Sequence, residues 1–413
     1  MKHVLPLLLL LCACQQNPDK YWPDGSKIGR WFSQEAPELR GAQATTFLIT
    51  DYGAIPDSLN LQTEAIQKAI DAAAEKGGTV VVPAGTYLTG ALFFKEGTHL
   101  HLEDGAVLKG SACIEDYPDV PVHIEGVLQP YPAAIINASG RQGFRITGKG
   151  TLDGNGAGFW DAFWARRREN PACTNLEVRR HRMIYISNSQ DLLIDGIRLR
   201  NSGFWNIHLY KCSRVRVKDI DVFAPVKPVW PPSTDGIDLD ACSDVHITGS
   251  SFSTGDDLIA LKGGKGPWAD EDPDNGINER VLVEDCRFGT GPGVLVFGSE
   301  CVGAHNIILR NSEAHGTGRL LWLKMRPDTP QEYSHIRVEN VRGEVKYVLF
   351  VKPWTQFFDL KGREDIPMSA AEDVSIQNCT LQCHKCREVK EAPDQYTLSG
   401  ITLKDNLIES ETE

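Results

Sequence analysis

Residues 245–264 read VHITGSSFSTGDDLIALKGG, and the fold can be worked out from the pattern in this stretch. Two runs of apolar and β-branched residues, which begin at Val245 and Leu258, are too short for helices and are separated by glycine and serine. Both runs therefore indicate strands. Two acids, Asp256 and Asp257, stand directly before the second run. Neighbouring side chains of a regular strand point to opposite faces, so a regular strand does not explain the pair.

The first run recurs along the chain, which indicates a repeat protein. Between residues 192 and 374, successive starts lie 23 to 38 residues apart. The other copies are FRITGKGTL at residue 144, LLIDGIRL at 192, VRVKDIDV at 215, VLVEDCRF at 281, IILRNSEA at 307, IRVENVRG at 336 and VSIQNCTL at 374. A second set of short runs, such as GIDLD, LIALK, VLVFG and LLWLK, lies between them without a helical pattern. The sequence therefore predicts an all-β chain folded as a parallel β-helix with stacked coils.

The start of the predicted solenoid differs from the rest. Residues 60–78, NLQTEAIQKAIDAAAEKGG, carry apolar residues at helical spacing and end in two glycines. This pattern predicts an amphipathic helix that caps the open end of the first coil. We expect one β-helix domain over residues 46–405 and a C-terminal tail over residues 406–413. Ser189, Cys212 and Cys242 each precede a run by three positions, and we expect them to form an inward-facing ladder.

The first residues predict export to the cell envelope. MKHVLPLLLLLCACQQ has a short basic start, a leucine run too short to span a bilayer, and a small residue before a cysteine. Residues 11–14 resemble a bacterial lipobox, which predicts a signal peptide over residues 1–13 and lipidation of Cys14. Residues 14–45 would then be a tether and N-terminal extension. We expect a lipid anchor at the periplasmic face or the surface of the outer membrane; secretion without lipid is the alternative.

Composition excludes some partners. The 413 residues carry a formal net charge of −12, which argues against nucleic acid because its binding proteins usually present a basic face.

The cysteine count does not indicate a disulfide framework, because nine cysteines, an odd number, remain after Cys12 is removed and Cys14 is lipidated. The pair Cys383 and Cys386 leaves zinc, a local disulfide or plain packing open. We expect a monomer without metal or cofactor.

The repeat predicts where the acids fall. Asp256 and Pro292 each follow the start of their run by 11 positions. Asp235 follows the start of its run by 20 positions, but this coil contains a proline-rich segment, APVKPVWPP, over residues 224–232. Without these nine residues, 11 positions again remain. Asp235, Asp256 and Pro292 are therefore predicted at one equivalent position on three successive coils, which stack about 4.8 Å apart.

Asp257 is predicted to join the same corner because Gly255 permits a bend before the strand. The three carboxylates then converge, and like charges so close raise at least one pKa, which separates a proton donor from a base. By contrast, Asp238, Asp240 and Asp244 are predicted to be turn residues that hydrogen-bond the backbone.

Four motifs occur in an order and spacing typical of one family. They are NSGFWNIHLYKC (201–212), STDGIDLDAC (233–242), STGDDLIALKGG (253–264) and GTGPGVLVFGSE (289–300). Over about residues 47–380 the chain resembles glycoside hydrolase family 28, the polygalacturonases and their relatives. The resemblance implies a right-handed parallel β-helix that hydrolyses α-linked galacturonic acid in pectin with inversion. It also implies that Asp256 is the general acid and that Asp235 and Asp257 are the bases that hold the water. Inverting enzymes commonly place acid and base roughly 6.5–9.5 Å apart.

Two departures from the family bear on the substrate. The family's Gly-His-Gly is here Gly-Pro-Gly at residues 291–293, and its Arg-Ile-Lys is Trp-Leu-Lys at residues 322–324. The resemblance implies that the missing histidine and arginine bind the uronate on the leaving-group side. Arginine suits a carboxylate and tryptophan suits the apolar face of a sugar, so we predict rhamnose or another neutral leaving sugar. Lys324 and Arg326 are expected to bind substrate carboxylates, and His208 and Trp322 are expected to contact sugar.

The sequence also bears on the mode of action. The segment 224–232 and a long loop over residues 264–279 predict a wall at one end of the cleft, and therefore exo action. Three alternatives remain open: an ordinary exo-polygalacturonase, a pectate lyase that would need calcium and an arginine base, and a non-catalytic surface protein that binds pectin.

Overall fold

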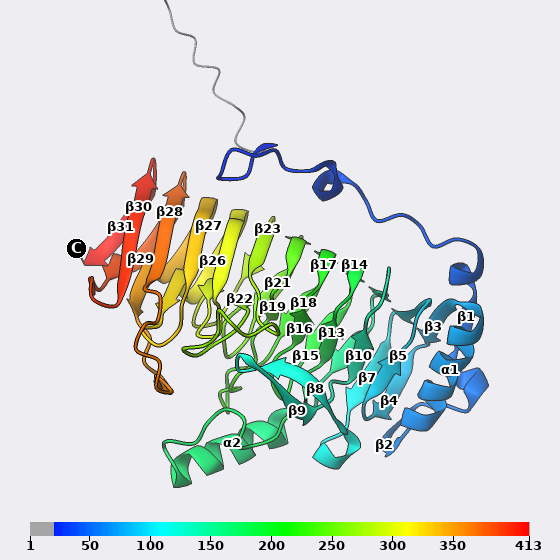
Figure 1. The fold of residues 1–413 in the computed structure, drawn as a ribbon. Helices are drawn as coiled ribbons and strands as arrows, with labels where there is room; N and C mark the ends of the chain where they lie inside the picture. Colours follow the sequence, from blue (N-terminus) through cyan, green and yellow to red (C-terminus); the bar gives the residue numbers. More distant parts are fainter. Residues whose placement is uncertain (1–19, 413) are drawn as a thin grey trace, which may run out of the picture.

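The structure, a computed structural model, describes residues 20–412. The strands of the coils pair in parallel with strands of the neighbouring coils, and the coils stack into one solenoid (Figure 1). The parallel β-helix that the repeats predict is confirmed. A regular coil contributes one short strand to each of three rows, which we number in chain order from the row that precedes the repeated runs.

Row 1 contains β5 (Leu92–Phe94), β10 (Ile136–Ser139), β13 (Ile184–Ser187), β16 (Ile207–Tyr210), β19 (Ile237–Asp240), β22 (Ile259–Lys262) and β25 (Leu295–Phe297). Row 2 contains β1 (Thr46–Leu48), β3 (Gly78–Val82), β6 (Thr98–Leu102), β11 (Arg145–Gly148), β14 (Gln190–Asp195), β17 (Ser213–Lys218), β20 (Ser243–Thr248) and β23 (Asn278–Glu284). Row 3 contains β2 (Asp57–Leu61), β4 (Gly85–Thr89), β7 (Ala106–Gly110), β12 (Thr151–Asp153), β15 (Arg198–Arg200), β18 (Asp221–Phe223), β21 (Ser251–Ser253) and β24 (Arg287–Phe288).

The last coils join the rows into longer strands. Strand β26 (Gly303–Met325) runs continuously beside β23, β24 and β25, and β27 (Glu332–Pro353) pairs along its length. Beyond them, β28 (Ser369–Gln377) and β30 (Tyr396–Lys404) continue row 2. Strand β29 (Thr380–Val389) pairs with the second half of β27, and β31 (Leu407–Thr412) pairs with β29.

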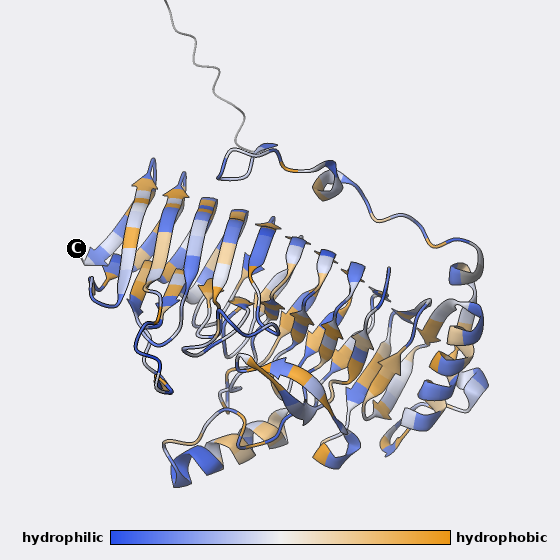
Figure 2. Ribbon diagram, in the orientation of Figure 1, coloured by the Kyte–Doolittle hydropathy of each residue, from blue (hydrophilic) through white to orange (hydrophobic). Residues whose placement is uncertain are grey.

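The core is a stack of aligned apolar side chains inside the coils. In row 1, Ile207, Ile237 and Ile259 occupy one register position and are fully buried. Figure 2 shows how hydrophobic residues gather on the solenoid strands, whereas the outer end of the second helix is hydrophilic. Ser189, Cys212 and Cys242 are buried at one register position of successive coils, which confirms the predicted ladder. The amides of Ser213 and Ser243 donate to the carbonyls of Ser189 and Cys212 on the preceding coils.

Seven of the nine cysteines among the described residues are buried, whereas Cys386 is partly buried and Cys113 is exposed. All nine cysteines among residues 20–412 have free thiols, so the local disulfide considered for Cys383 and Cys386 is wrong. Within the same residues, neither belongs to a group of side chains that could hold a metal ion. Packing is the alternative that the structure supports.

Helix α1 (Thr63–Lys76) covers the first coil, as predicted (Figure 1). Its apolar face, Ile66, Ala69, Ile70 and Ala73, is fully buried against the solenoid. Short 3-10 helices occupy Arg30–Ser33, Gly41–Ala44, Ile49–Tyr52 and Ile114–Asp116. In the part of the chain that the structure describes, no helix has the length and apolar character needed to span a membrane.

The N-terminal extension lies along the outer face of row 2. Trp22 and Phe32 pack on Leu282 and Ile308, and the Arg216 guanidinium stacks 4.0 Å from the Trp31 ring. The part from Lys20 onward is therefore attached to the solenoid instead of forming a free tether. Cys14 and the predicted signal peptide lie outside the described residues.

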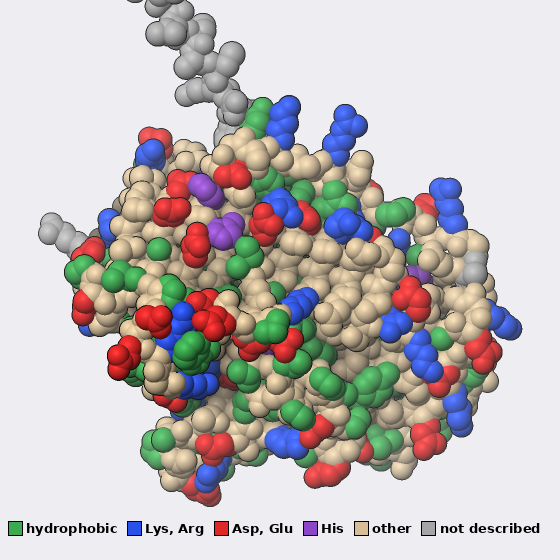
Figure 3. Space-filling model, in the orientation of Figure 1, with side chains coloured by type: hydrophobic (Ala, Val, Ile, Leu, Met, Phe, Trp, Pro, Cys, Tyr) green, Lys and Arg blue, Asp and Glu red, His purple; other side chains and the backbone are tan. Residues whose placement is uncertain are grey.

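Two elements outside the coils cover row 1. The antiparallel hairpin of β8 (Asp119–Ile124) and β9 (Val127–Pro132) packs Val122 and Ile124 on Tyr185, Phe204 and Trp205. Helix α2 (Ala157–Glu169) lies beside it and attaches through the Trp160 indole, which donates to the Ser202 carbonyl. The sequence did not predict either element. On the face shown in Figure 3, acidic and basic side chains are interspersed, and acidic ones gather over the loops of the C-terminal half.

Candidate active site

The strand register brings the three predicted acids together in row 1. One carboxylate oxygen from each of Asp235, Asp256 and Asp257 lies within 4.8 Å of the others. Asp235 and Asp257 are almost completely buried, and Asp256 is half-buried. These three residues, which we call the acid triad, form the convergent patch that the sequence predicts.

The predicted alignment within the triad is wrong by one position. Ile237 pairs with Ile259, so Asp235 aligns with Asp257 and not with Asp256. The reason lies in the proline-rich segment: the Ala224 amide still bonds to the Ser253 carbonyl, so Ala224 belongs to the regular coil. The extra segment therefore has eight residues, 225–232.

The bend before β22 explains how adjacent acids reach one site. Asp256 and Asp257 precede the strand, and the Asp257 amide donates to the Asp256 carboxylate at 3.0 Å. A side chain at Gly255 would collide with the Pro231 carbonyl of the extra segment. Glycine thus lets the neighbouring coil approach closely, and strand alternation does not apply to the pair.

Two lysines distinguish the members of the triad. Lys324 Nζ lies 2.7 Å from Asp257 Oδ2, and Lys262 Nζ lies 3.4 Å from Asp235 Oδ2. Asp256 makes no ion pair with any of residues 20–412. A cation favours the charged carboxylate, so Asp235 and Asp257 are suited to be bases and Asp256 is suited to hold a proton.

The pKa shifts of Asp256 and Asp235 indicate that the carboxyl groups of the triad share protons. Burial, then Asp235 and Asp257, raise the pKa of Asp256 well above its usual range. Burial, then Asp238, also raise the pKa of Asp235, while Lys262 opposes them. The protons of such close carboxyls belong to the group and not to one residue. The triad can therefore hold one proton for a leaving group while it keeps a negative charge for a water.

The short spacing differs from the expectation for inversion. Oxygens within 4.8 Å of one another are closer than the roughly 6.5–9.5 Å common in inverting glycosidases. The physical reason is that the acid, Asp256, directly precedes Asp257, which aligns with Asp235 on the adjacent coil.

His208 is too deeply buried to touch a substrate, so its predicted sugar contact is wrong. It is fully buried, with Nε2 3.0 Å from Asp240 Oδ2 and Nδ1 3.0 Å from Arg182 Nη1. Burial lowers the pKa of His208 to about 4, so the imidazole is neutral. His123 of β8 approaches the same Asp240 oxygen at 2.7 Å. The hairpin, which the sequence did not predict, covers the face on which His208 would otherwise be exposed.

Arg326 and Trp322 also differ from the predictions. Arg326 is buried and gives two bonds to Asp328 and others to loop carbonyls, so it holds a loop and not a substrate. Trp322 is 6% exposed and packs on Val296 and Phe350. It thus offers little surface to a sugar. Lys324 lies at the site as predicted, but its ammonium is already bound to Asp257.

The three acids predicted to be turn residues, Asp238, Asp240 and Asp244, all lie within strands instead. Asp238 and Asp240 belong to β19 and are buried. Asp238 Oδ1 lies 3.4 Å from Lys262 Nζ, and burial raises the pKa of Asp238 to about 7 against the opposing effect of that lysine. Asp244 belongs to β20, where it has a φ of 54° and accepts from the Arg280 guanidinium instead of bonding the backbone.

Sequence reasoning missed Arg319, which is half-buried and close to the triad. Its guanidinium lies 3.9 Å from the Trp322 ring centre and 4.3 Å from that of Phe350, and Nη1 donates to the Pro292 carbonyl at 3.2 Å. Leu295 pairs with Leu321, so Arg319 occupies the register position of Asp257 two coils further on. The repeat register could have identified Arg319, because it precedes Leu321 by two positions just as Asp257 precedes Ile259 by two positions. Arg319 thus places a guanidinium beside Trp322, the residue at the position of the family's arginine.

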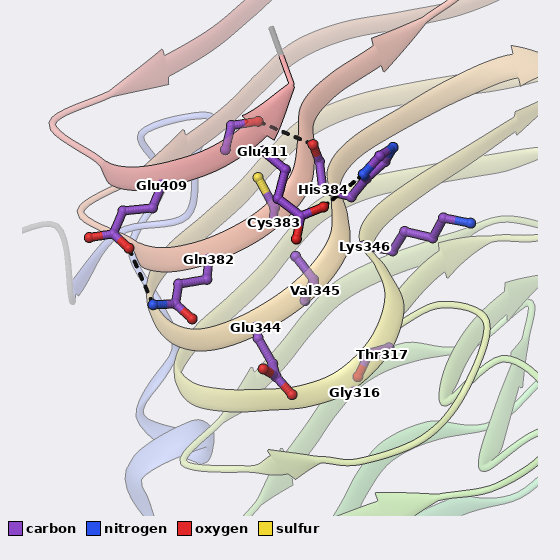
Figure 4. Close-up of a pocket in the computed structure, with 11 residues that line it drawn as sticks. Gly316, Thr317, Glu344, Val345, Lys346, Gln382, Cys383, His384, Glu409 and Glu411 are labelled. Carbon is purple, nitrogen blue, oxygen red and sulfur yellow. Dashed lines mark hydrogen bonds and ion pairs between the residues drawn. The ribbon is translucent and has the colours of Figure 1, made fainter.

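A recess in the last coils contains none of the triad (Figure 4). It has a volume of about 550 Å³ and is lined by residues that include Glu344, His384, Glu409 and Glu411. His384 Nδ1 lies 3.0 Å from Glu411. Thr317, at its edge, bridges to Gly291, which places the recess beyond the triad on the later coils. Its carboxylates would repel uronates that extend in this direction.

The comparisons with known proteins agree with this fold and site. The family described as glycosyl hydrolases family 28 matches residues 78–409, and the chain belongs to this family. A probable polygalacturonase of Vitis vinifera is 29% identical over 292 residues, which cover 64% of this chain and 55% of that protein. An exo-poly-alpha-D-galacturonosidase of Dickeya chrysanthemi is 28% identical over 313 residues, 64% of this chain and 50% of that protein. The chain thus spans about half the length of these relatives.

Solved structures show the same fold. An exopolygalacturonase of Thermotoga maritima superposes with a TM-score of 0.77 at 21% identity, over 91% of this chain and 89% of that one. A polygalacturonase of Erwinia carotovora gives 0.67 at 19% identity, over 92% and 99%. These matches confirm that the chain has the parallel β-helix fold of pectinases.

Proposed function

We propose that the protein hydrolyses α-galacturonosyl linkages in pectin with inversion at the anomeric carbon. The observation that carries the proposal is the unequal pairing of the triad: lysines hold Asp235 and Asp257, whereas Asp256 forms no ion pair within residues 20–412. Asp256 gives its proton to the glycosidic oxygen as the bond to C1 breaks. Water attacks C1, and its proton passes to Asp235 or Asp257. No metal or cofactor is needed for this step.

The stereochemical outcome is tested by the anomer of the first product. Because the triad is more compact than the spacing common in inverting enzymes, proton NMR during early turnover is the decisive readout. We expect the β-anomer of galacturonic acid to appear first. Early release of the α-anomer would contradict inversion.

The covered part of row 1 supports exo action. The hairpin lies over β13, β16 and β19, and the Trp230 indole donates to the Gly255 carbonyl at 2.7 Å beside the triad. Among the described residues, the hairpin and Trp230 therefore cover coils that precede the acids, where they would obstruct a polysaccharide. Chromatography of the products tests this: galacturonic acid monomer is expected from the start, and a ladder of intermediate oligomers would contradict exo action.

The leaving sugar has two candidates. Rhamnose or another neutral sugar is favoured by Pro292 in place of the family's histidine and by the acidic recess on the later coils. Galacturonate, the substrate of an ordinary exo-polygalacturonase, is favoured by Arg319. Initial rates on oligogalacturonides and on rhamnogalacturonan fragments distinguish them. We propose the neutral sugar, and a higher kcat/KM on oligogalacturonides would select the other candidate.

Two further alternatives are excluded by simple readouts. A pectate lyase would form an unsaturated product that absorbs in the ultraviolet and would stop when calcium is chelated. A non-catalytic pectin-binding protein would retain oligosaccharides without releasing sugar. Hydrolysis that survives a chelator, without ultraviolet absorbance, excludes both.

We also propose that the protein is a monomer attached to the outer membrane by lipid at Cys14. The lipobox-like residues 11–14 support this proposal. Labelling with an alkyne fatty acid tests it: the wild type is expected to incorporate the label, and equal labelling of Cys14→Ala would contradict it.

A further inference from the structure

A buried ammonium lies directly behind the acid triad. Lys262, at the end of β22, has a side chain that is 8% exposed. Its Nζ lies 3.0 Å from Glu300 Oε2, 3.4 Å from Asp235 Oδ2 and 3.4 Å from Asp238 Oδ1. It also lies 4.6 Å from the centre of the Trp205 ring. One cation thus serves three carboxylates in a site that water barely reaches.

The surroundings of Asp235 make this cation important. The charged groups that face Asp235 are Asp238 from its own strand, Asp256 and Asp257 from the bend before β22, Lys262 from β22, Lys324 from β26 and Arg180 from the segment before β13. Lys324 is committed to Asp257, and Arg180 donates its bonds to Pro232, Ser233 and Asn175. Lys262 is therefore the one cation within 4.0 Å of the Asp235 carboxylate among residues 20–412.

We infer that Lys262 is a positioning residue for the hydrolysis proposed above: it orients the Asp235 carboxylate toward the triad and supplies a positive charge that favours the charged form a base requires. This inference rests on the proposed function. The Lys262 side chain is 8% exposed and its ammonium is bound to three carboxylates, so its role lies in the arrangement of Asp235 and not in a contact with the substrate. An uncompensated carboxylate at this depth would take up a proton and could no longer accept one from water.

Two related groups complete the arrangement. Glu300 is buried, and Lys262 and Lys265 hold its pKa below its usual range against the effect of burial. Burial alone would lower the pKa of Lys262, but Glu300, Asp235 and Asp238 outweigh it and hold this pKa well above its usual range. Lys262 is therefore charged throughout the pH range of the reaction.

The test uses the full chain and the pH profile of kcat/KM. In Lys262→Met the base loses its cation, so the pKa of Asp235 rises and the acidic limb of the profile moves upward by about 1 pH unit or more. At a pH on the wild-type plateau below this new limb, kcat falls by about 10-fold or more while KM changes less than about threefold. Lys262→Arg keeps the charge and is expected to restore the limb to its wild-type position.

Two controls separate this role from a structural one. Lys262→Met/Glu300→Gln removes one positive and one negative charge, so a folded protein is expected even if the single variant unfolds. The shifted limb should persist in the double variant. Lys352 occupies the same register position on a later coil and pairs with Glu388. Lys352→Met is expected to leave the limb unchanged.

Each outcome has one meaning. An unshifted limb in folded Lys262→Met, or a wild-type limb in the double variant, would overturn the inference while the proposed function stands. A folded wild type that releases no sugar from any pectic substrate would overturn the proposed function itself.

Discussion

At the scale of single residues, the triad is controlled by its neighbours more than by its own composition. Three aspartates on one patch would repel one another, but one lysine holds each of the two proposed bases. The remaining acid, Asp256, is the most exposed of the three, as a group that must reach a leaving oxygen should be. The three side chains are chemically identical, so their different roles come from their exposure and from the lysines beside them.

Arg319 provides a prediction about substrate choice. Arg319→Gln is expected to lower kcat/KM by about 10- to 100-fold on oligogalacturonides, because a charge-assisted bond to a carboxylate is lost. The rate on substrates with rhamnose as the leaving sugar should change less than about twofold. Initial rates on both substrates provide the measurement, and the exposed Arg287→Gln serves as the control. Equal losses on both substrates would show that Arg319 has only a packing role.

The sequence predicts single residues well only where the repeat frame reaches them. Asp235, Asp256 and Asp257 lie where the counting predicts, apart from one position in the extra segment. His208 and Arg326 were predicted at the surface, but other parts of the chain bury them. The burial of an outward-facing side chain depends on what covers the sheet, and the repeat does not contain this information.

At the scale of elements, the β8–β9 hairpin has the largest effect on the site. Two histidines, His123 of the hairpin and His208 of row 1, share one oxygen of Asp240, and apolar residues of the hairpin pack on Phe204 and Trp205. The sequence predicted a wall from residues 224–232 and 264–279. The repeat pattern does not predict the hairpin, because its strands are antiparallel and lie outside the repeat, where the register count does not apply.

Removing this wall should change the products. We expect that replacing residues 119–132 by a short glycine-serine linker, with Phe204→Ser to keep the uncovered face polar, opens row 1 to longer chains. Chromatography of pectic digests should then show intermediate oligomers in addition to monomer. Thermal unfolding confirms that the variant is folded. Monomer as the sole early product of a folded variant would contradict the role of the hairpin.

At the scale of the whole molecule, stability is distributed along a line of coils, each of which contacts mainly its neighbours. The ends of such a line are exposed unless something covers them. Helix α1 covers the first coil with a face that periodicity alone predicts, and the N-terminal extension packs along row 2. The fold class was predictable because every coil repeats the same signal, whereas the attached segments occur once each.

The cap gives a prediction about stability. Ile70 is fully buried between α1 and the first coils, so Ile70→Ala should destabilise the protein by about 2–5 kcal/mol. Lys68→Ala, on the exposed side of the same helix, should change the stability by less than about 0.5 kcal/mol. Denaturant unfolding followed by circular dichroism measures both. Equal stability of the two variants would show that α1 does not act as a cap.

The central claim is that the acid triad hydrolyses α-galacturonosyl linkages with Asp256 as the proton donor. The most direct measurement is the release of galacturonic acid from a panel of defined pectic oligosaccharides by the wild type and by Asp256→Asn, which keeps the shape of the side chain but has no acidic proton. We expect the wild type to release monomer and the variant to lose at least about 1,000-fold in kcat with its thermal unfolding unchanged. A wild type that releases no sugar from the panel, or a variant that keeps the wild-type rate, would contradict the claim.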